Sequence, residues 1–278
     1  MGFWSAVGSF CSSCWSAVCS IGSAIGSAAS SLVSGAGSFV SGCISTVGSA
    51  LASFATGTLS VLLGSSVEIA VAVAVINEVL NAVGKLLGGD EEIALEEIPL
   101  DELGFRASVS DKRPEDFANS ARYLEHLAKY QQYHDKFKQL SAEQRLGCQA
   151  LGLGIKSNYI AEKLGVKITP QSLGTLAKIE AARYGLTNLS EQSQPAVERQ
   201  LQTAQASIDT RDAPALVALV QALKAQGVTD MNDVSDLIEG VGTSDRAKTG
   251  EAVVQALGEN GADRLRAWKD ACRSQDEL

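Results

Sequence analysis

The chain has few residues that could perform catalysis or hold a metal. Cys11 and Cys14 have the C-x-x-C spacing of zinc and redox motifs, but no second cysteine pair or nearby histidine completes a zinc site. The two histidines, His126 and His134, have no supporting metal ligand. We therefore expect surface or capping histidines, apolar cysteines of a reducing compartment, no cofactor and no enzyme activity.

The most regular polar side chains are serine hydroxyls near the N-terminus. Fifteen positions follow one another in a repeating step of four, three and four residues, and all but Gly42 and Thr56 are serine. This eleven-residue repeat closes three helical turns at about 98° per residue, so the positions share one face of a helix. We expect this uncharged stripe to line a pore or a packing interface. The serines are Ser5, Ser9, Ser12, Ser16, Ser20, Ser23, Ser27, Ser31, Ser34, Ser38, Ser45, Ser49 and Ser53.

Two further series repeat with the serines. Apolar or small residues from Phe3 to Phe54 lie opposite the serine stripe, and a third column begins with two tryptophans and continues as glycine. Small residues let helix backbones approach closely, while tryptophan favours the membrane–water interface. The predicted interface anchors are Trp4 and Trp15, and the predicted zipper glycines are Gly22, Gly26, Gly37 and Gly48.

A flexible Gly/Ser linker is the alternative, because both residues are poor helix formers in water. The regular opposition of two series favours a helix that needs lipid or self-association to form. Its full length would be roughly 80 Å, well over the thickness of a bilayer, so we expect a hairpin broken near residues 35–37.

Residues 58–87 are more apolar. They predict either one membrane span with the intramembrane charge Glu68 or a buried core helix. The alternation at 69–75 would also suit a strand, but we expect a helix.

Charge divides the chain into three parts. Residues 1–89 form a membrane-active region with three charged side chains, residues 90–104 form an acidic linker, and residues 105–278 form an all-helical domain. No basic patch indicates nucleic acid, and no basic residue precedes Lys85 to begin a secretory signal. We expect a protein that is cytoplasmic in the producer and exported without a signal peptide.

The C-terminal part predicts an all-α fold. Residues 114–140 read as one amphipathic helix, and Gly227, Gly240, Gly250 and Gly258 read as helix stops. Further helices are expected at 194–208, 213–226, 232–239, 246–257 and 261–274. Residues 140–145 and 159–166 look like the opening of a helix-turn-helix, and the helix that would read DNA has only Lys178 as a base.

Residues 3–87 resemble the glycine-zipper pore-forming toxins that bacteria deliver into competitors, including type VI secretion effectors. The resemblance rests on the zipper glycines and the serine columns, and the chain departs from the family in using more serine than glycine. It implies a homo-oligomer that permeabilises the lipid bilayer of a target cell. The helical remainder would then shield the apolar half before release, dock secretion machinery or bind an immunity protein. The implied partners are a secretion-machinery component, a chaperone or an immunity protein.

Two other functions stay open. A structural protein could assemble through the same repeats into a helical bundle or filament without lipid. A helix-turn-helix regulator would instead bind duplex DNA.

The serine stripe gives the first testable prediction. Replacing Ser20, Ser27 and Ser31 by Leu should abolish conductance in planar bilayers, because the hydroxyl face would no longer be polar. An unaltered current would show that the stripe does not line the conducting path.

Overall fold

The computed structural model describes residues 66–88, 98–112, 114–130, 134–140, 142–168, 170–186, 194–208, 212–241 and 246–276. Within these ranges every regular element is a helix, apart from one isolated bridge between Lys167 and Asp230, so the all-α prediction is confirmed there. The serine repeat lies outside the described residues. The chain divides into two compact units, unit 1 (1–49 and 87–160) and unit 2 (50–86 and 161–278).

The described helices of unit 1 are short except for the last. They are α4 (Leu100–Val109), the 3-10 turn η1 (Pro114–Asp116), α5 (Ser120–Lys129), α6 (His134–Lys138) and α7 (Ala142–Leu164), whose residues up to 160 belong to this unit. Helix α4 begins five residues before the expected domain start at 105. Its first turn carries Asp101 and Glu102, which suit the positive end of the helix dipole.

The single helix expected at 114–140 is wrong. The backbone N–H of Arg122 donates to the Asn119 side chain at 3.0 Å, which caps the start of α5. At the other end, the Arg106 guanidinium donates to the carbonyls of Leu127 at 3.0 Å and Ala128 at 2.7 Å. Those carbonyls are satisfied by a side chain from α4, so the chain can leave the helix at Tyr130, which is extended.

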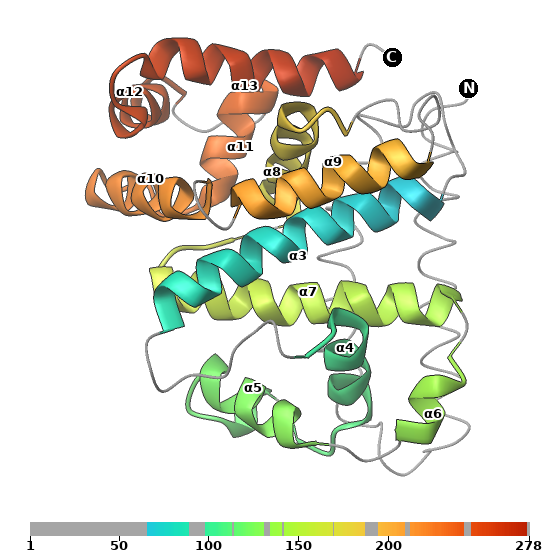
Figure 1. Ribbon diagram of the computed structural model, residues 1–278. Helices are drawn as coiled ribbons and strands as arrows, with labels where there is room; N and C mark the ends of the chain where they lie inside the picture. The colour runs from blue at the N-terminus through green and yellow to red at the C-terminus, as the bar shows by residue number, and fades with distance from the viewer. Residues whose placement is uncertain are drawn as a thin grey trace, which may run out of the picture. The chain divides into compact units, whose positions relative to one another are not determined.

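Helices α4 and α7 pack backbone against backbone within unit 1 (Figure 1). A Cβ added to Gly104 would lie 1.8 Å from the carbonyl oxygen of Cys148, and one added to Gly152 would lie 2.3 Å from that of Leu100. Only glycine fits at either position. The same crossing carries an ion pair of 3.1 Å between Arg145 and Asp101.

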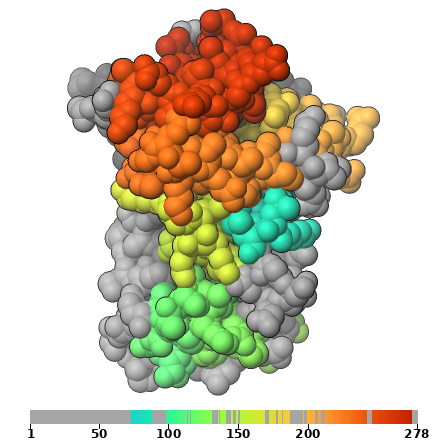
Figure 2. All heavy atoms as spheres, turned by 90° about the vertical axis from the view of Figure 1, so that its left-hand side faces the viewer, coloured from blue at the N-terminus to red at the C-terminus, as the bar shows by residue number. Residues whose placement is uncertain are grey.

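Unit 2 contains helix α3 and the helices of the C-terminal half. They are α3 (Ser66–Gly88, up to 86 in this unit), α8 (Pro170–Arg183), α9 (Gln194–Ser207), α10 (Ala213–Ala225), α11 (Met231–Glu239), α12 (Arg246–Leu257) and α13 (Gly261–Asp276). The five helices predicted beyond residue 190 are confirmed within two residues at each end. Helix α11 packs against α8, α12 and α13 (Figure 1), and α12 and α13 form a continuous surface in the space-filling view (Figure 2).

The main core of unit 2 is formed by side chains of α10, α11, α12 and α13. Its fully buried side chains include Leu223, Val253 and Cys272, and the partly buried Trp268 packs against them. Gly227, Gly240 and Gly258 have positive φ and end helices as predicted. Gly250 lies inside α12, so its assignment as a stop is wrong, because a glycine within a helix costs only about 1 kcal/mol and packing overrides it.

The turns after α7 and α10 pair with each other in unit 2. The Lys167 N–H donates to the carbonyl of Thr229 at 2.8 Å, and the Met231 N–H donates to the carbonyl of Lys167 at 3.0 Å. The Lys167 ammonium also contacts the Asp230 carboxylate at 2.7 Å, and this exposed pair raises the pKa of Lys167. These bonds join two loops that are about sixty residues apart.

The glycine crossing in unit 1 predicts a large penalty for a single methyl group. Gly104→Ala should lower the free energy of unfolding by about 1 to 3 kcal/mol, because the added Cβ forces the backbones of α4 and α7 apart. Urea denaturation followed by circular dichroism measures this. Gly250→Ala is the matched control: its Cβ would lie 3.7 Å from the nearest Leu237 atom, so stability should be unchanged or higher. Equal effects of the two changes would contradict the proposed close crossing.

Candidate membrane-active helix

Of the site residues expected from the sequence, Glu68 is the one that falls within a described helix, which is α3. It is a 23-residue helix, so the helical prediction for residues 69–75 is confirmed over the strand alternative. Glu68 lies in its first turn, and nothing of that side chain is described. The thirteen serines, the four zipper glycines and both tryptophan anchors lie outside the described residues.

The described apolar side chains of α3 are mostly buried. The buried ones are Val73, Val75, Ile76, Val79, Leu80, Ala82 and Val83. At 100° per residue these positions fall within an arc of about 180°, which is one side of the helix. Near the end of α3, Lys85 is exposed and Leu86 is 50% exposed. The apolar side of such a helix needs to be covered by protein or lipid.

The polar residues of α3 gather on one side. Asn77 and Asn81 lie one turn apart, and Asn81 is 9% exposed. Both side chains have interactions in the folded chain. The sequence showed these asparagines only as the end of an apolar run, and the useful signal was their spacing of four residues within a helix.

Among the residues that the structure describes, no helix is long and apolar enough to cross a membrane. Seven apolar side chains in the described part of α3 are buried, as expected for the core-helix alternative of residues 58–87.

The described residues elsewhere offer little reactive chemistry. No group of three histidine, cysteine or acidic residues within the described ranges could hold a metal ion. Burial raises the pKa of the Cys148 thiol to about 12, which keeps it protonated and unreactive near neutral pH. Near the end of α8 the Tyr184 hydroxyl donates to the Asp212 carboxylate, and burial, with this bond, raises the pKa of Tyr184 to about 12.

One contact of a histidine, between His126 and Ser110, was not foreseen from the sequence. The Nε2 atom of His126 lies 3.1 Å from the Ser110 hydroxyl, and the imidazole ring lies between the rings of Phe117 and Tyr130. The same hydroxyl accepts the N–H of Lys112 at 3.1 Å, directly after α4 ends. His126 is thus partly buried and joins the end of α4 to α5. Ser110 lies sixteen residues before His126 in the sequence, whereas Phe117 and Tyr130 are closer to it along the chain.

The comparisons with known proteins give no relative: no family model, curated protein or solved structure matches the chain.

The base expected on a DNA-reading helix is inside unit 2. Lys178 of α8 is 4% exposed, and its ammonium lies 3.6 Å from the Glu239 carboxylate at the end of α11. The Thr175 hydroxyl donates to the same carboxylate at 2.8 Å. This ion pair holds α8 to α11, and it keeps Lys178 away from the protein surface.

The buried pair predicts a stability role for Lys178. Lys178→Met should lower the free energy of unfolding by about 3 kcal/mol, because it leaves the Glu239 carboxylate with one fewer partner in a desolvated site. Adding Glu239→Leu should recover at least half of the loss, and urea denaturation measures both. A single variant that folds as stably as wild type but binds duplex DNA more weakly would instead support the regulator.

Proposed function

We propose that this protein is a membrane-permeabilising effector that keeps an apolar helix covered in a folded helical body and acts on a target membrane as an oligomer. The observation that carries the proposal is the burial of α3, whose apolar side chains leave only its end exposed. The uncharged serine-striped sequence before it adds a second segment that favours lipid.

The energetics of α3 favour an exchange of protein contacts for lipid contacts. Lipid tails are about as apolar as leucine side chains, so moving a covered apolar helix into lipid loses little hydrophobic free energy. Moving it into water exposes seven apolar side chains and is strongly unfavourable. A covered apolar helix is therefore stable in water as part of the folded body and can still transfer to a bilayer.

The proposed pore turns the serine stripe toward the lumen or the packed interior and the apolar series toward lipid. Trp4 and Trp15 anchor the helices at the interface. The helical body beyond residue 98 shields α3 before release, docks secretion machinery or binds an immunity protein. In an interbacterial setting this body is made in the producer's cytoplasm, and the activity appears at the target membrane.

A second candidate is a helical assembly that forms without lipid. The close approach of α4 and α7 at Gly104 and Gly152 favours this candidate. The approach is a tight helix crossing made by small residues within a folded unit. The serine and glycine columns of the N-terminal repeat would extend such packing between chains.

Dye release from liposomes separates the two candidates. The full-length chain should release a trapped dye, whereas a protein beginning at Asp90, which lacks the repeat and α3, should not. Circular dichroism of the shorter protein should first establish that it is helical. Release by both proteins would move the activity to the helical body. No release, together with large particles in lipid-free solution by light scattering, would replace the toxin by the assembly.

A further inference from the structure

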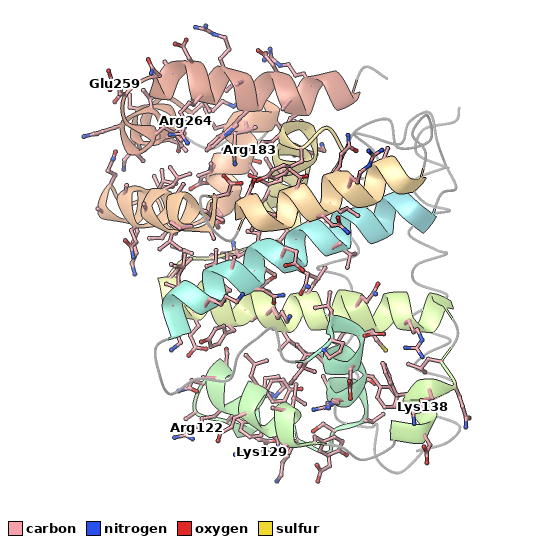
Figure 3. All side chains as sticks on the ribbon, viewed as in Figure 1. Arg122, Lys129, Lys138, Arg183, Glu259 and Arg264 are labelled. Atoms are coloured by element: carbon pink, nitrogen blue, oxygen red, sulfur yellow. The ribbon has the colours of Figure 1, made fainter. Side chains whose placement is uncertain are left out.

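The turn between α12 and α13 holds a chemically reactive pair of residues. Asn260 and Gly261 form the one Asn–Gly sequence of the chain. Asn260 is exposed and has a φ of 64°, and Gly261 is the buried first residue of α13. Figure 3 shows Glu259 and Arg264, which flank the pair in the sequence, at this turn.

An Asn–Gly sequence can modify itself with water as its only co-reactant. The Gly261 backbone nitrogen attacks the side-chain amide carbon of Asn260 and closes a succinimide ring, while the amide nitrogen leaves as ammonia with the proton of the attacking nitrogen. Water then opens the ring at one of its two carbonyls. One opening gives an aspartyl residue, and the other gives an isoaspartyl residue, whose main chain is one carbon longer. Glycine favours the first step because no Cβ shields its nitrogen.

We propose that Asn260 is a site of spontaneous isoaspartate formation that is controlled by opening of the turn between α12 and α13. The folded turn protects the pair, and a local opening of the turn lets it cyclise. The inference does not depend on the membrane activity, because it concerns α12 and α13 alone.

Two hydrogen bonds carry the protection. The peptide group between Asn260 and Gly261 is held at both ends, since its N–H donates to the Gly258 carbonyl at 2.9 Å and its carbonyl accepts the Arg264 N–H at 3.0 Å. Cyclisation removes the proton of the first bond and turns the peptide group toward the Asn260 side chain, so both bonds have to break. Together they should slow the reaction by at least about tenfold.

The buried side of the turn decides what the product does. A Cβ added to Gly261 would lie 2.1 Å from the carbonyl oxygen of Val254, so α13 begins against the backbone of α12. The Arg264 guanidinium donates to the Leu257 carbonyl at 3.0 Å, and Leu257 and Leu265 belong to the core of unit 2. A main chain that is one carbon longer between them shifts α13 away from α12. An aspartyl residue keeps the original length, and its charge suits the start of a helix.

Peptide mapping of the aged full-length protein tests the site. The protein is kept in mildly alkaline buffer with and without guanidinium chloride, and the unmodified, aspartyl and isoaspartyl forms of residue 260 are quantified over time by liquid chromatography and mass spectrometry. In denaturant Asn260 should react faster than every other asparagine. In native buffer it should react at least about ten times more slowly than in denaturant. Equal rates in the two buffers, or a faster reaction at another asparagine of the denatured chain, would overturn the site.

Arg264→Ala tests the control by the turn, because it removes the side-chain bond that joins the start of α13 to the end of α12. It should speed the native reaction by about fivefold and leave the rate in denaturant unchanged. The matched control is Arg266→Ala. Arg266 is 72% exposed and pairs with Asp263 of the same helix, so this variant should react like wild type. Equal native rates in the two variants would overturn the control by the turn. Should Arg264→Ala fail to fold, Arg264→Lys decides, with an increase of about twofold expected.

The modified protein is compared with Asn260→Asp, which has the same added charge and an unchanged main chain. The charge-shifted fraction of aged wild type, isolated by anion exchange, should contain isoaspartyl chains that unfold at lower urea than Asn260→Asp. Asn260→Gly keeps the positive φ without the amide, so its stability should be the same before and after ageing. Isoaspartyl chains that unfold together with Asn260→Asp would show that α13 accommodates the longer main chain, which overturns the structural consequence.

Discussion

The fold depends on one constraint: the apolar side of a helix in water has to be covered. Seven described apolar side chains of α3 are buried. Covering them contributes on the order of 10 kcal/mol, which is as large as the whole net stability of a typical domain. Exposure of α3 to water would therefore cost as much as unfolding.

Three of the described helices, α5, α7 and α12, end where a basic side chain from a neighbouring helix reaches a terminal carbonyl. Arg106 of α4 does this for α5, Lys224 of α10 donates to the carbonyl of Leu164 at 2.9 Å for α7, and Arg264 of α13 donates to that of Leu257 at 3.0 Å for α12. Figure 3 shows Arg264 beside the end of α12. A positive charge suits the negative end of a helix dipole. Each bond therefore ends one helix and joins it to another, which makes the helix ends part of the tertiary structure.

This dependence explains which features could be predicted from the sequence. The helices at 213–225 and 246–257 have their own apolar periodicity, and Gly227 and Gly258 provide left-handed ends, so local rules were sufficient. The break between α5 and α6 depends on Arg106, which is more than twenty residues away, and no local pattern indicates it. Gly250 was misread because a glycine in a helix resembles a stop when its packing is unknown.

For the candidate site, the helix α3 followed from its apolar run. That Asn77 and Asn81 share one side of α3 did not, because two asparagines four residues apart become neighbours only once the segment is known to be a helix.

Most of the net charge of the chain lies in the acidic residues at 90–104. The net charge of −9 comes mostly from the seven acidic residues at 90–104, since residues 1–89 and 105–278 each contribute −1. Two of those seven are structural rather than part of a linker: Asp101 pairs with Arg145, and Glu102 pairs with Arg106 at 2.8 Å. Glu102 thereby orients the same guanidinium that caps α5. Asp101 is therefore part of the α4–α7 crossing, and Glu102 acts through Arg106 on the end of α5.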